Sequence, residues 1–376
     1  MCAFRDGLWA ISRSPVNGSK PTLLNSDEIR KISGVIDLVT LGHGIGVVAD
    51  TLEKALKVKA QLKIQWSTGA KAASHNSEQA YAEYTALVMD ENRKGRSLEA
   101  KGDLNNALKD ASKVYSATYK NSAWKYIISG TGDNLLASGA EMPFYTLPDL
   151  QIELRAIDHG MRTKHWRAVG HGPNKYAIEA FIDEVAHDQK KDPYQYRRHL
   201  MRNHPRALKV LETVAEMAGW GKKLPAGRAM GIAFAERSGS PGAGICEISL
   251  DRATGKIKVH HIWAAVDGGV IVQPDNAKAQ TEGSLLMGLS SIFHESITIK
   301  NGEAQQSNFH DYPILRMEDV PETLEVKFID SQEAPSGLGE AGLPFIGPAV
   351  ANAFLALTGK ALRHMPFTPE KVLAML

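Results

Sequence analysis

A glycine-rich segment near the C-terminus constrains the fold most, because it places a carboxylate between glycines just ahead of a helix. Residues 337–345 read Gly-Leu-Gly-Glu-Ala-Gly-Leu-Pro-Phe, and the apolar run 348–355 that follows predicts a helix. Glycine permits positive φ and close backbone approach, so we expect a tight loop that presents Glu340. A carboxylate held near apolar surface has its charged form disfavoured, as in acids and bases that work near neutral pH. The alternative is a solvated Glu340 in a surface turn.

Length and charge narrow the class of protein. A chain of 376 residues is too long for one ordinary core, so we expect two or more domains. The net charge of +2 gives no support for a nucleic-acid partner. No apolar run approaches the roughly 20 residues that span a bilayer. The N-terminus lacks the regions of a signal peptide, which predicts a cytoplasmic protein, with a periplasmic location open if a further N-terminal segment exists.

The cysteine content limits redox chemistry within the chain. Cys2 and Cys246 are the two cysteines of the sequence. Two thiols are too few for an iron–sulfur cluster, a four-cysteine zinc site or a disulfide framework. The histidines form no metal-binding spacing, so we expect no protein-ligated metal. Any electron carriers must be non-protein cofactors or partner subunits.

The alternation of strand-like and helical segments predicts an α+β fold in three parts. In residues 1–70, the glycines at 42, 44 and 46 predict a hairpin, and a capping box from Asp50 to Glu53 opens a helix over 52–61. Residues 71–124 read as a linker and the remnant of a further domain, with a helix at 104–111 and a strand at 114–119. Residues 125–376 form the last domain.

A second loop precedes another predicted helix. Residues 163–174 read Thr-Lys-His-Trp-Arg-Ala-Val-Gly-His-Gly-Pro-Asn. Ala177, Ala180, Phe181 and Val185 then mark one face of an amphipathic helix. The loop therefore delivers Arg167 to a helix N-terminus, an arrangement that suits anions. The alternative is an arginine in an interdomain salt bridge.

A helix over 276–292 is expected between the two loops. Gln280, Ser284, Met287 and Ser291 share one of its faces. Small and polar residues on a helix face permit either a ligand or a second helix to approach closely, and the pattern favours helix packing.

The two loops occur in a fixed order with further motifs between them, and together these resemble the molybdenum hydroxylase family. The intervening motifs are Val-Asp-Gly-Gly at 266–269 and Ser-Asn-Phe-His-Asp-Tyr-Pro at 307–313. The resemblance is to the large, molybdopterin-binding subunit, of the isoquinoline 1-oxidoreductase and aldehyde dehydrogenase type. It is dense from about residue 138 onward and extends to residues 1–66, which resemble the family's α/β-hammerhead domain.

The resemblance implies roles for particular residues. Glu340 matches the family's base beside the molybdenum, and Arg167 matches the arginine that orients the substrate or stabilises negative charge. The backbone at Trp166, Arg167 and Ala168, and at Gly339, Ala341 and Gly342, would approach the pterin. The implied cofactor is molybdopterin, in its cytosine dinucleotide form. The implied substrate is an aldehyde or N-heterocycle, and the electrons would leave through a [2Fe-2S] partner subunit.

Two family motifs are absent from the sequence. The Gly-Gln-Gly and Gly-Gly-Gly-Phe-Gly strings of such subunits, which help to hold the pterin and its nucleotide, do not occur here. The chain therefore resembles a shortened member. This leaves a non-catalytic scaffold without cofactor as the main alternative, with a metal-free hydrolase using Glu340 and Arg167 as a third reading.

Overall fold

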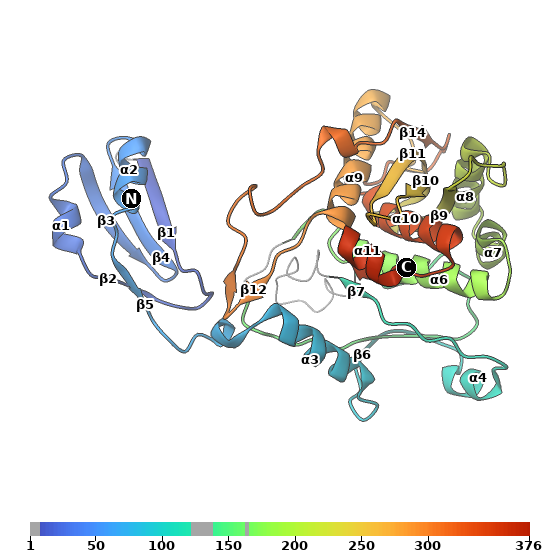
Figure 1. Cartoon of the computed structure of the whole chain (residues 1–376), viewed down its shortest axis with the longest axis horizontal. Coiled ribbons are helices and arrows are strands. Elements are labelled where there is room, and N and C mark those ends of the chain that lie inside the picture. The colour runs from blue at the N-terminus through green and yellow to red at the C-terminus, as the bar shows by residue number, and fades with distance from the viewer. Residues whose placement is uncertain (1–7, 122–137, 162–164) are drawn as a thin grey trace. The chain divides into compact units, whose positions relative to one another are not determined.

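The computed structural model describes residues 8–121, 138–161 and 165–376, and the chain divides into two compact units (Figure 1). The first unit consists of Met1–Arg93, Ala156–Arg162 and Thr298–Ser307. The second consists of Lys94–Arg155, Thr163–Ile297 and Asn308–Leu376. Both units mix helices and strands, as the sequence predicts. The domain boundaries at residues 70 and 124 stay predictions.

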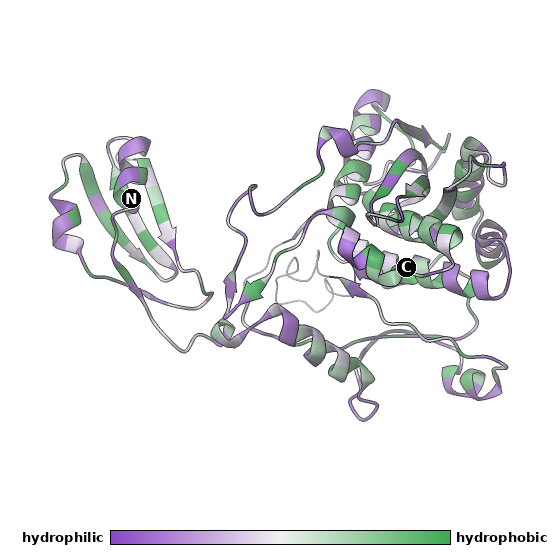
Figure 2. Ribbon diagram, viewed as in Figure 1, coloured by the Kyte–Doolittle hydropathy of each residue, from purple (hydrophilic) through white to green (hydrophobic). Residues whose placement is uncertain are grey.

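The first unit is built on a small antiparallel sheet with strand order β1-β4-β3. Ile29, Leu38, Val47 and Val58 form its main core cluster. In Figure 2 the helices α1 and α2 are largely hydrophilic, whereas the neighbouring strands carry hydrophobic residues. The elements of this unit are β1 Leu8–Arg13, β2 Pro21–Leu23, α1 Ser26–Arg30, β3 Val35–Leu41, β4 Gly44–Ala49, α2 Leu52–Lys59, β5 Ile64–Trp66, η1 Lys71–Ser74, α3 Ser77–Met89, β12 Ile299–Lys300 and β13 Glu303–Ala304.

Two local predictions for the first unit meet different outcomes. The glycine-rich stretch after residue 41 is a hairpin, because β3 and β4 pair antiparallel with Leu41 opposite Gly44. The helix α2 forms where expected, but its N-cap is Thr51, whose hydroxyl accepts a hydrogen bond from the Lys54 amide at 3.2 Å. Asp50, predicted to open the capping box, is instead paired with Lys54 at 2.8 Å.

The predicted linker over 71–124 contains more regular structure than expected. The helix α3 was not predicted, whereas α4 matches the helix expected at 104–111. The strand expected at 114–119 is wrong, since those residues have no strand assignment. A β-prone segment forms a strand only with a partner, and the first pairing here begins at Lys120, opposite His364.

The second unit is organised around a four-stranded sheet with order β14-β11-β10-β9. The hairpins β9-β10 and β10-β11 are antiparallel, and β14 joins β11 in parallel. The elements of this unit are β6 Arg96–Lys101, α4 Leu104–Asp110, β7 Lys120–Asn121, β8 Leu150–Leu154, α6 His171–Asp188, α7 Pro193–Leu200, α8 Pro205–Ala218, β9 Arg228–Arg237, β10 Ser240–Leu250, β11 Ile257–Val266, α9 Pro274–Phe293, η2 Met317–Asp319, β14 Thr323–Phe328, α10 Leu343–Thr358, β15 His364–Met365 and α11 Pro369–Met375.

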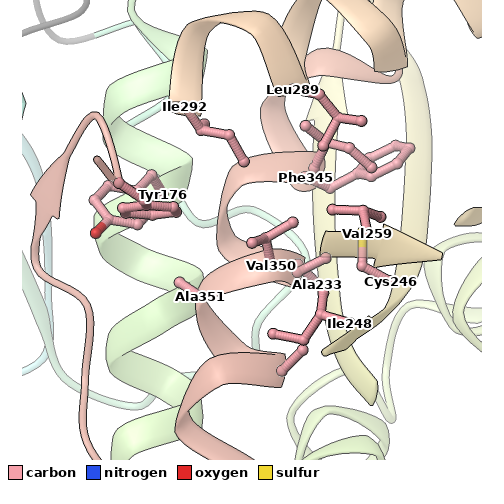
Figure 3. Close-up of a cluster of buried hydrophobic side chains, with 14 of the residues drawn as sticks. Tyr176, Ala233, Cys246, Ile248, Val259, Leu289, Ile292, Phe345, Val350 and Ala351 are labelled. Carbon is pink, nitrogen blue, oxygen red and sulfur yellow. The ribbon is translucent and has the colours of Figure 1, made fainter. Parts of the chain in front are cut away.

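Side chains of this sheet alternate between two cores. Ala233 and Cys246 face one cluster, together with residues of α6, α9 and α10. Ile232 and Ile245 face the other, with residues of α8. Figure 3 shows Cys246, Ile248 and Phe345 within the first cluster. The period of two along β9 and β10 thus places a helix layer on each side of the sheet.

The helix α10 lies unusually close to the sheet because glycines face it. A Cβ on Gly231 of β9 would lie 2.1 Å from the Ala353 nitrogen, and one on Gly244 of β10 would lie 2.4 Å from the Phe345 ring. Residues 343–355 of α10 are all buried. The start of this helix, and the glycine-rich loop before it, are therefore fixed against β9 and β10.

The helix α6 forms as predicted but buries a different face. Phe181 and Val185 are only half-buried, whereas Glu179 and Asp183 are buried. The reason is Arg197 of α7, which is fully buried and donates hydrogen bonds to both of these carboxylates. Glu179 also accepts from the Phe234 amide at 2.9 Å and the Tyr145 hydroxyl at 2.5 Å. A buried ionic network that joins α6, α7 and β9 overrides the apolar pattern.

Candidate functional site

The Trp-Arg loop makes a tight turn into α6. Ala168 and Val169 both have positive φ, of 71° and 49°, which is unusual for residues other than glycine. The Val169 amide donates to the Trp166 carbonyl and the His171 amide to the Ala168 carbonyl, each at 2.9 Å. Ala168 is completely buried. This turn fixes the direction in which Arg167 leaves the backbone.

Arg167 donates hydrogen bonds to the glycine-rich loop itself and to the helix α9. Its Nε donates to the Gly339 carbonyl at 2.7 Å, and one terminal nitrogen donates to the Gln280 carbonyl of α9 at 3.0 Å. These acceptors are neutral, so the guanidinium charge is left available to a nearby anion. Burial lowers the pKa of Arg167, and the negative charge of Glu340 opposes that effect. The interdomain salt bridge considered for this arginine is not what the structure contains.

Glu340 is half-buried and lies between two guanidinium groups. Its carboxylate accepts a hydrogen bond from Nε of Arg237, at the end of β9, at 2.5 Å. Its charge also acts on Arg167. The structure thus adds an ion pair to the expected loop, and the apolar surroundings expected for this carboxylate stay a prediction.

The rest of the loop connects Glu340 to the first turn of α10. Ala341 is buried, and Gly342 is the N-cap residue of the helix. A Cβ on Gly342 would lie 2.9 Å from the Leu285 side chain, so this glycine is required by packing against α9. The Leu343 amide donates to the hydroxyl of Ser284 at 2.9 Å. Ser284 and Ser291 are thus helix-packing residues, as the pattern favoured.

Two glycines near Arg167 are not explained by packing within the chain. A Cβ on Gly283 would lie 3.9 Å from the Arg167 side chain, and one on Gly339 would lie 3.6 Å from the Gln280 amide nitrogen, both ordinary contacts. Glycine in these places exposes backbone toward open space. A flat group such as a pterin fits against exposed backbone of this kind, so the residues present suit the cofactor that the sequence implies.

The electrostatics beyond Arg237 are set by buried groups of α6. His171 is nearly buried, and burial together with the charges of Arg237 and Lys175 lowers its pKa to about 3. Its Nδ1 lies 3.0 Å from the Ser138 hydroxyl. Burial also lowers the pKa of Lys175, whose ammonium donates to the Glu141 carbonyl at 2.6 Å. His171 is therefore a neutral neighbour of the site near neutral pH.

A cavity of about 430 Å³ lies next to Gln280 and Leu338. Its lining comes from the end of β11, the start of α9 and the segment before Gly339. The lining residues are Gly268, Val270, Ile271, Val272, Gln273, Asn276, Ala277, Gln280, Pro335, Ser336 and Leu338. The volume falls in the range of small-molecule sites. Among the residues that the structure describes, no cluster of His, Cys, Asp and Glu could hold a metal ion.

The structure brings the two predicted loops together and adds residues that the sequence did not single out. Trp166 packs against the first core cluster, and Arg167, Gly339 and Glu340 are neighbours. Arg237 was missed because it sits at a strand end with no motif around it. Its one available signal was an arginine next to the turn-forming Ser238-Gly239 pair, whose φ values are 57° and 82°.

Part of the chain matches a known domain. Residues 177–321 match the molybdopterin cofactor-binding domain. Over 231 residues the chain is 36% identical to isoquinoline 1-oxidoreductase subunit beta of Brevundimonas diminuta, which covers 61% of this chain and 29% of the relative. It is 40% identical over 246 residues to the membrane-bound aldehyde dehydrogenase [pyrroloquinoline-quinone] of Gluconacetobacter polyoxogenes, covering 59% and 32%. The matched part is thus about a third of the length of these relatives.

Solved structures share the fold. The aldehyde oxidoreductase of Desulfovibrio desulfuricans ATCC 27774 superposes with a TM-score of 0.76 at 12% identity, over 100% of this chain and 78% of the other. Quinoline 2-oxidoreductase of Pseudomonas putida 86 gives 0.70 at 9% identity, over 100% and 95%. No helix in the described ranges is long and apolar enough to cross a bilayer. The chain thus contains a match to the molybdopterin cofactor-binding domain and is similar, over about a third of their length, to these two oxidoreductases.

Proposed function

We propose that the chain contributes the base and part of the cofactor site of a molybdenum hydroxylase. The reaction is oxidation of an aldehyde or N-heterocycle carbon with oxygen from water. The observation that carries the proposal is the pair of bonds from Arg167 to Gly339 and Gln280, which joins both family loops beside Glu340. When bound, molybdopterin supplies the redox centre that accepts the electrons.

The residues of this chain have separate tasks in the proposal. The backbone at Trp166, Arg167 and Gly339 would lie against the pterin, whereas Ala168, Ala341 and Gly342 are buried within the chain and would shape the two loops. Glu340, held in place by its ion pair with Arg237, accepts the proton that the attacking oxygen releases. Arg167, whose hydrogen-bond acceptors are neutral carbonyl groups, stabilises negative charge that develops on the substrate.

The cavity beside Gln280 has room for a small aldehyde or heterocycle. We further propose a cytosine dinucleotide form of the cofactor, a [2Fe-2S] partner subunit as electron acceptor and a cytoplasmic location. The matched part is 29% and 32% of the length of the two relatives.

The test is Glu340→Gln in the complex reconstituted with cofactor and partner. This variant keeps the shape of the side chain but cannot accept the proton, so we expect turnover to fall by about 10²-fold or more, with molybdenum and pterin contents unchanged. Glu333→Gln, at an exposed position before the same loop, is the control. Wild-type turnover with full molybdenum would reject Glu340 as base. Absence of molybdenum and pterin from the wild-type complex would favour the non-catalytic scaffold.

A further inference from the structure

The tip of the β9-β10 hairpin is hydrogen-bonded to the segment that carries Glu340. Ser238 and Gly239 form the two-residue turn, with Arg237 opposite Ser240 in the register. The Gly337 amide donates to the Ser238 carbonyl at 3.1 Å. The Ser240 and Ser336 hydroxyls lie 2.7 Å apart, within hydrogen-bonding distance. Together with the bond from Arg237 to Glu340, three contacts fix residues 336, 337 and 340 against one hairpin.

These contacts are close enough for the hairpin to fix the position of the loop that carries Glu340. A Cβ on Gly337 would lie 2.7 Å from the Ser238 side chain, so the two backbones are in close contact. Further along the hairpin, the ring of Phe345 lies against Gly242 and Gly244. Glu340 is therefore held from both sides of its loop by the same pair of strands, and only Arg237 contacts its carboxylate by a hydrogen bond among the described residues.

From these contacts we propose that Arg237 is a positioning residue for Glu340. It orients the carboxylate, so that one oxygen is bound and the other is left to accept a proton. This inference rests on the proposed function, because it gives Glu340 the part of the base. Nothing in the sequence pattern assigns Arg237 to the reaction.

Several charged groups surround the pair. Arg167 acts on Glu340 from the Trp-Arg loop, and the charges of Arg237 and Lys175 act on His171 of α6. In the same hairpin turn, Glu236 accepts a hydrogen bond from the Gly239 amide and Arg206 donates one to the Gly239 carbonyl. His171 has a pKa of about 3 and stays neutral in the range where the enzyme would work. Lys175 is bound to a backbone carbonyl. The residues of α9 nearest the loop, Gln280 and Ser284, do not titrate.

The first experiment needs no cofactor. In the full chain labelled with ¹⁵N-arginine, the Nε–H signal of Arg237 is assigned by its loss in Arg237→Lys. An Nε–H bonded to a carboxylate is shifted and exchanges slowly with water. We expect this signal to follow one titration in the wild type and to lose both its shift and its pH dependence in Glu340→Gln. An Arg237 signal that is identical in the wild type and in Glu340→Gln overturns the inference.

The second experiment uses the reconstituted complex. Arg237→Gln removes the hydrogen bond that orients the Glu340 carboxylate. It should therefore lower kcat about tenfold across its pH profile with KM changed less than about twofold, since orientation is lost and not substrate binding. Arg237→Lys should restore part of the loss.

Arg228→Gln is the matched control, because Arg228 lies on the same strand and pairs with Glu247 of β10 at 2.7 Å. An unchanged profile in Arg237→Gln, with Glu340→Gln inactive, overturns the inference and leaves the proposed function standing. Normal turnover of Glu340→Gln overturns both. A loss in Arg228→Gln equal to that in Arg237→Gln would mean a general effect on the sheet and also reject the positioning role.

Discussion

Asp183 and Glu179 share a single buried guanidinium, and the two carboxylates are not equally supplied with partners. Glu179 accepts from a backbone amide and a tyrosine hydroxyl besides Arg197, whereas among the described residues Asp183 accepts a hydrogen bond from Arg197 alone. Burial raises the pKa of Asp183 from 3.8 to about 6, against the opposing effect of Arg197. Near neutral pH this carboxylate is ionised in a site that favours the proton.

This imbalance predicts a pH dependence of stability. Between pH 3.8 and about 6 the folded protein keeps a proton on Asp183 that the unfolded chain has released, so its stabilising contribution falls as pH rises through that window. From pH 3 to 7 the unfolding free energy of the wild type should fall relative to Asp183→Asn by about 3 kcal/mol. Urea unfolding at several pH values measures this. Parallel curves for the two proteins would contradict it, and Asp330→Asn, at an exposed position, is the control.

Single residues also mark the limit of what the sequence could predict. Glu340 and Arg167 could be selected because glycines and a following helix surround them. Arg237 could not, because its relation to Glu340 spans 103 positions and depends on the pairing of β9 with β10. The ion pair of Glu340 could not be predicted for the same reason, since the local pattern does not contain the partner of a charge.

At the scale of elements, α9 combines two roles on neighbouring turns. Ser284 and Gly288 face α10, whereas Gly283 and Gln280 face Arg167. The sequence pattern predicted the helix and its packing face, because small residues recur at helical spacing. It could not predict that Gln280, on the same face, would use its backbone carbonyl to bind an arginine.

Substitution of Gly283 should affect the stability of the chain and its cofactor binding in different ways. Alanine in a helix interior is favoured over glycine by about 1 kcal/mol, and an added Cβ has room here, so Gly283→Ala should keep or raise the melting temperature. If a pterin lies against this backbone, the same methyl should lower the molybdenum and pterin content of the reconstituted complex severalfold. Metal and pterin analysis after gel filtration measures the loss. Full cofactor content in Gly283→Ala would remove this glycine from the proposed site.

The face of α6 shows where an apolar pattern misleads. Alternation of apolar residues located the helix correctly, but Glu179 and Asp183 took the buried side because Arg197 of the next helix neutralises them. Helix existence follows from local sequence, whereas the orientation of a helix depends on tertiary partners. The helix α3 was missed for a different reason, because its apolar residues do not gather on one face.

For the whole molecule, the division into two units predicts separate unfolding. The first unit has small core clusters, and the second has two large ones on either side of its sheet. We expect calorimetry to resolve two transitions, the first unit melting at the lower temperature. A single transition in which both units melt together would contradict this.

A variant in the buried network of Arg197, Glu179 and Asp183 should identify which thermal transition belongs to the second unit. Arg197→Met strands two buried carboxylates, which costs about 3–5 kcal/mol and should lower only the upper transition, by roughly 10 °C. Arg198→Met, on the same helix but in a half-exposed pair with Glu212, should move neither transition by more than about 3 °C. Equal shifts in both variants would place the stability elsewhere.

The buried position of Cys246 makes its thiol a probe for local opening of the second unit. This thiol is completely buried on the central strand β10, and burial raises its pKa, so a thiol reagent reaches it only while the sheet and α10 have separated. In a Cys2→Ser background, the labelling rate of Cys246 therefore measures how often the sheet and α10 separate. Cys246 thus lies in the core that fixes the loop of Glu340. A cofactor bound to that loop should therefore lower the labelling rate of Cys246.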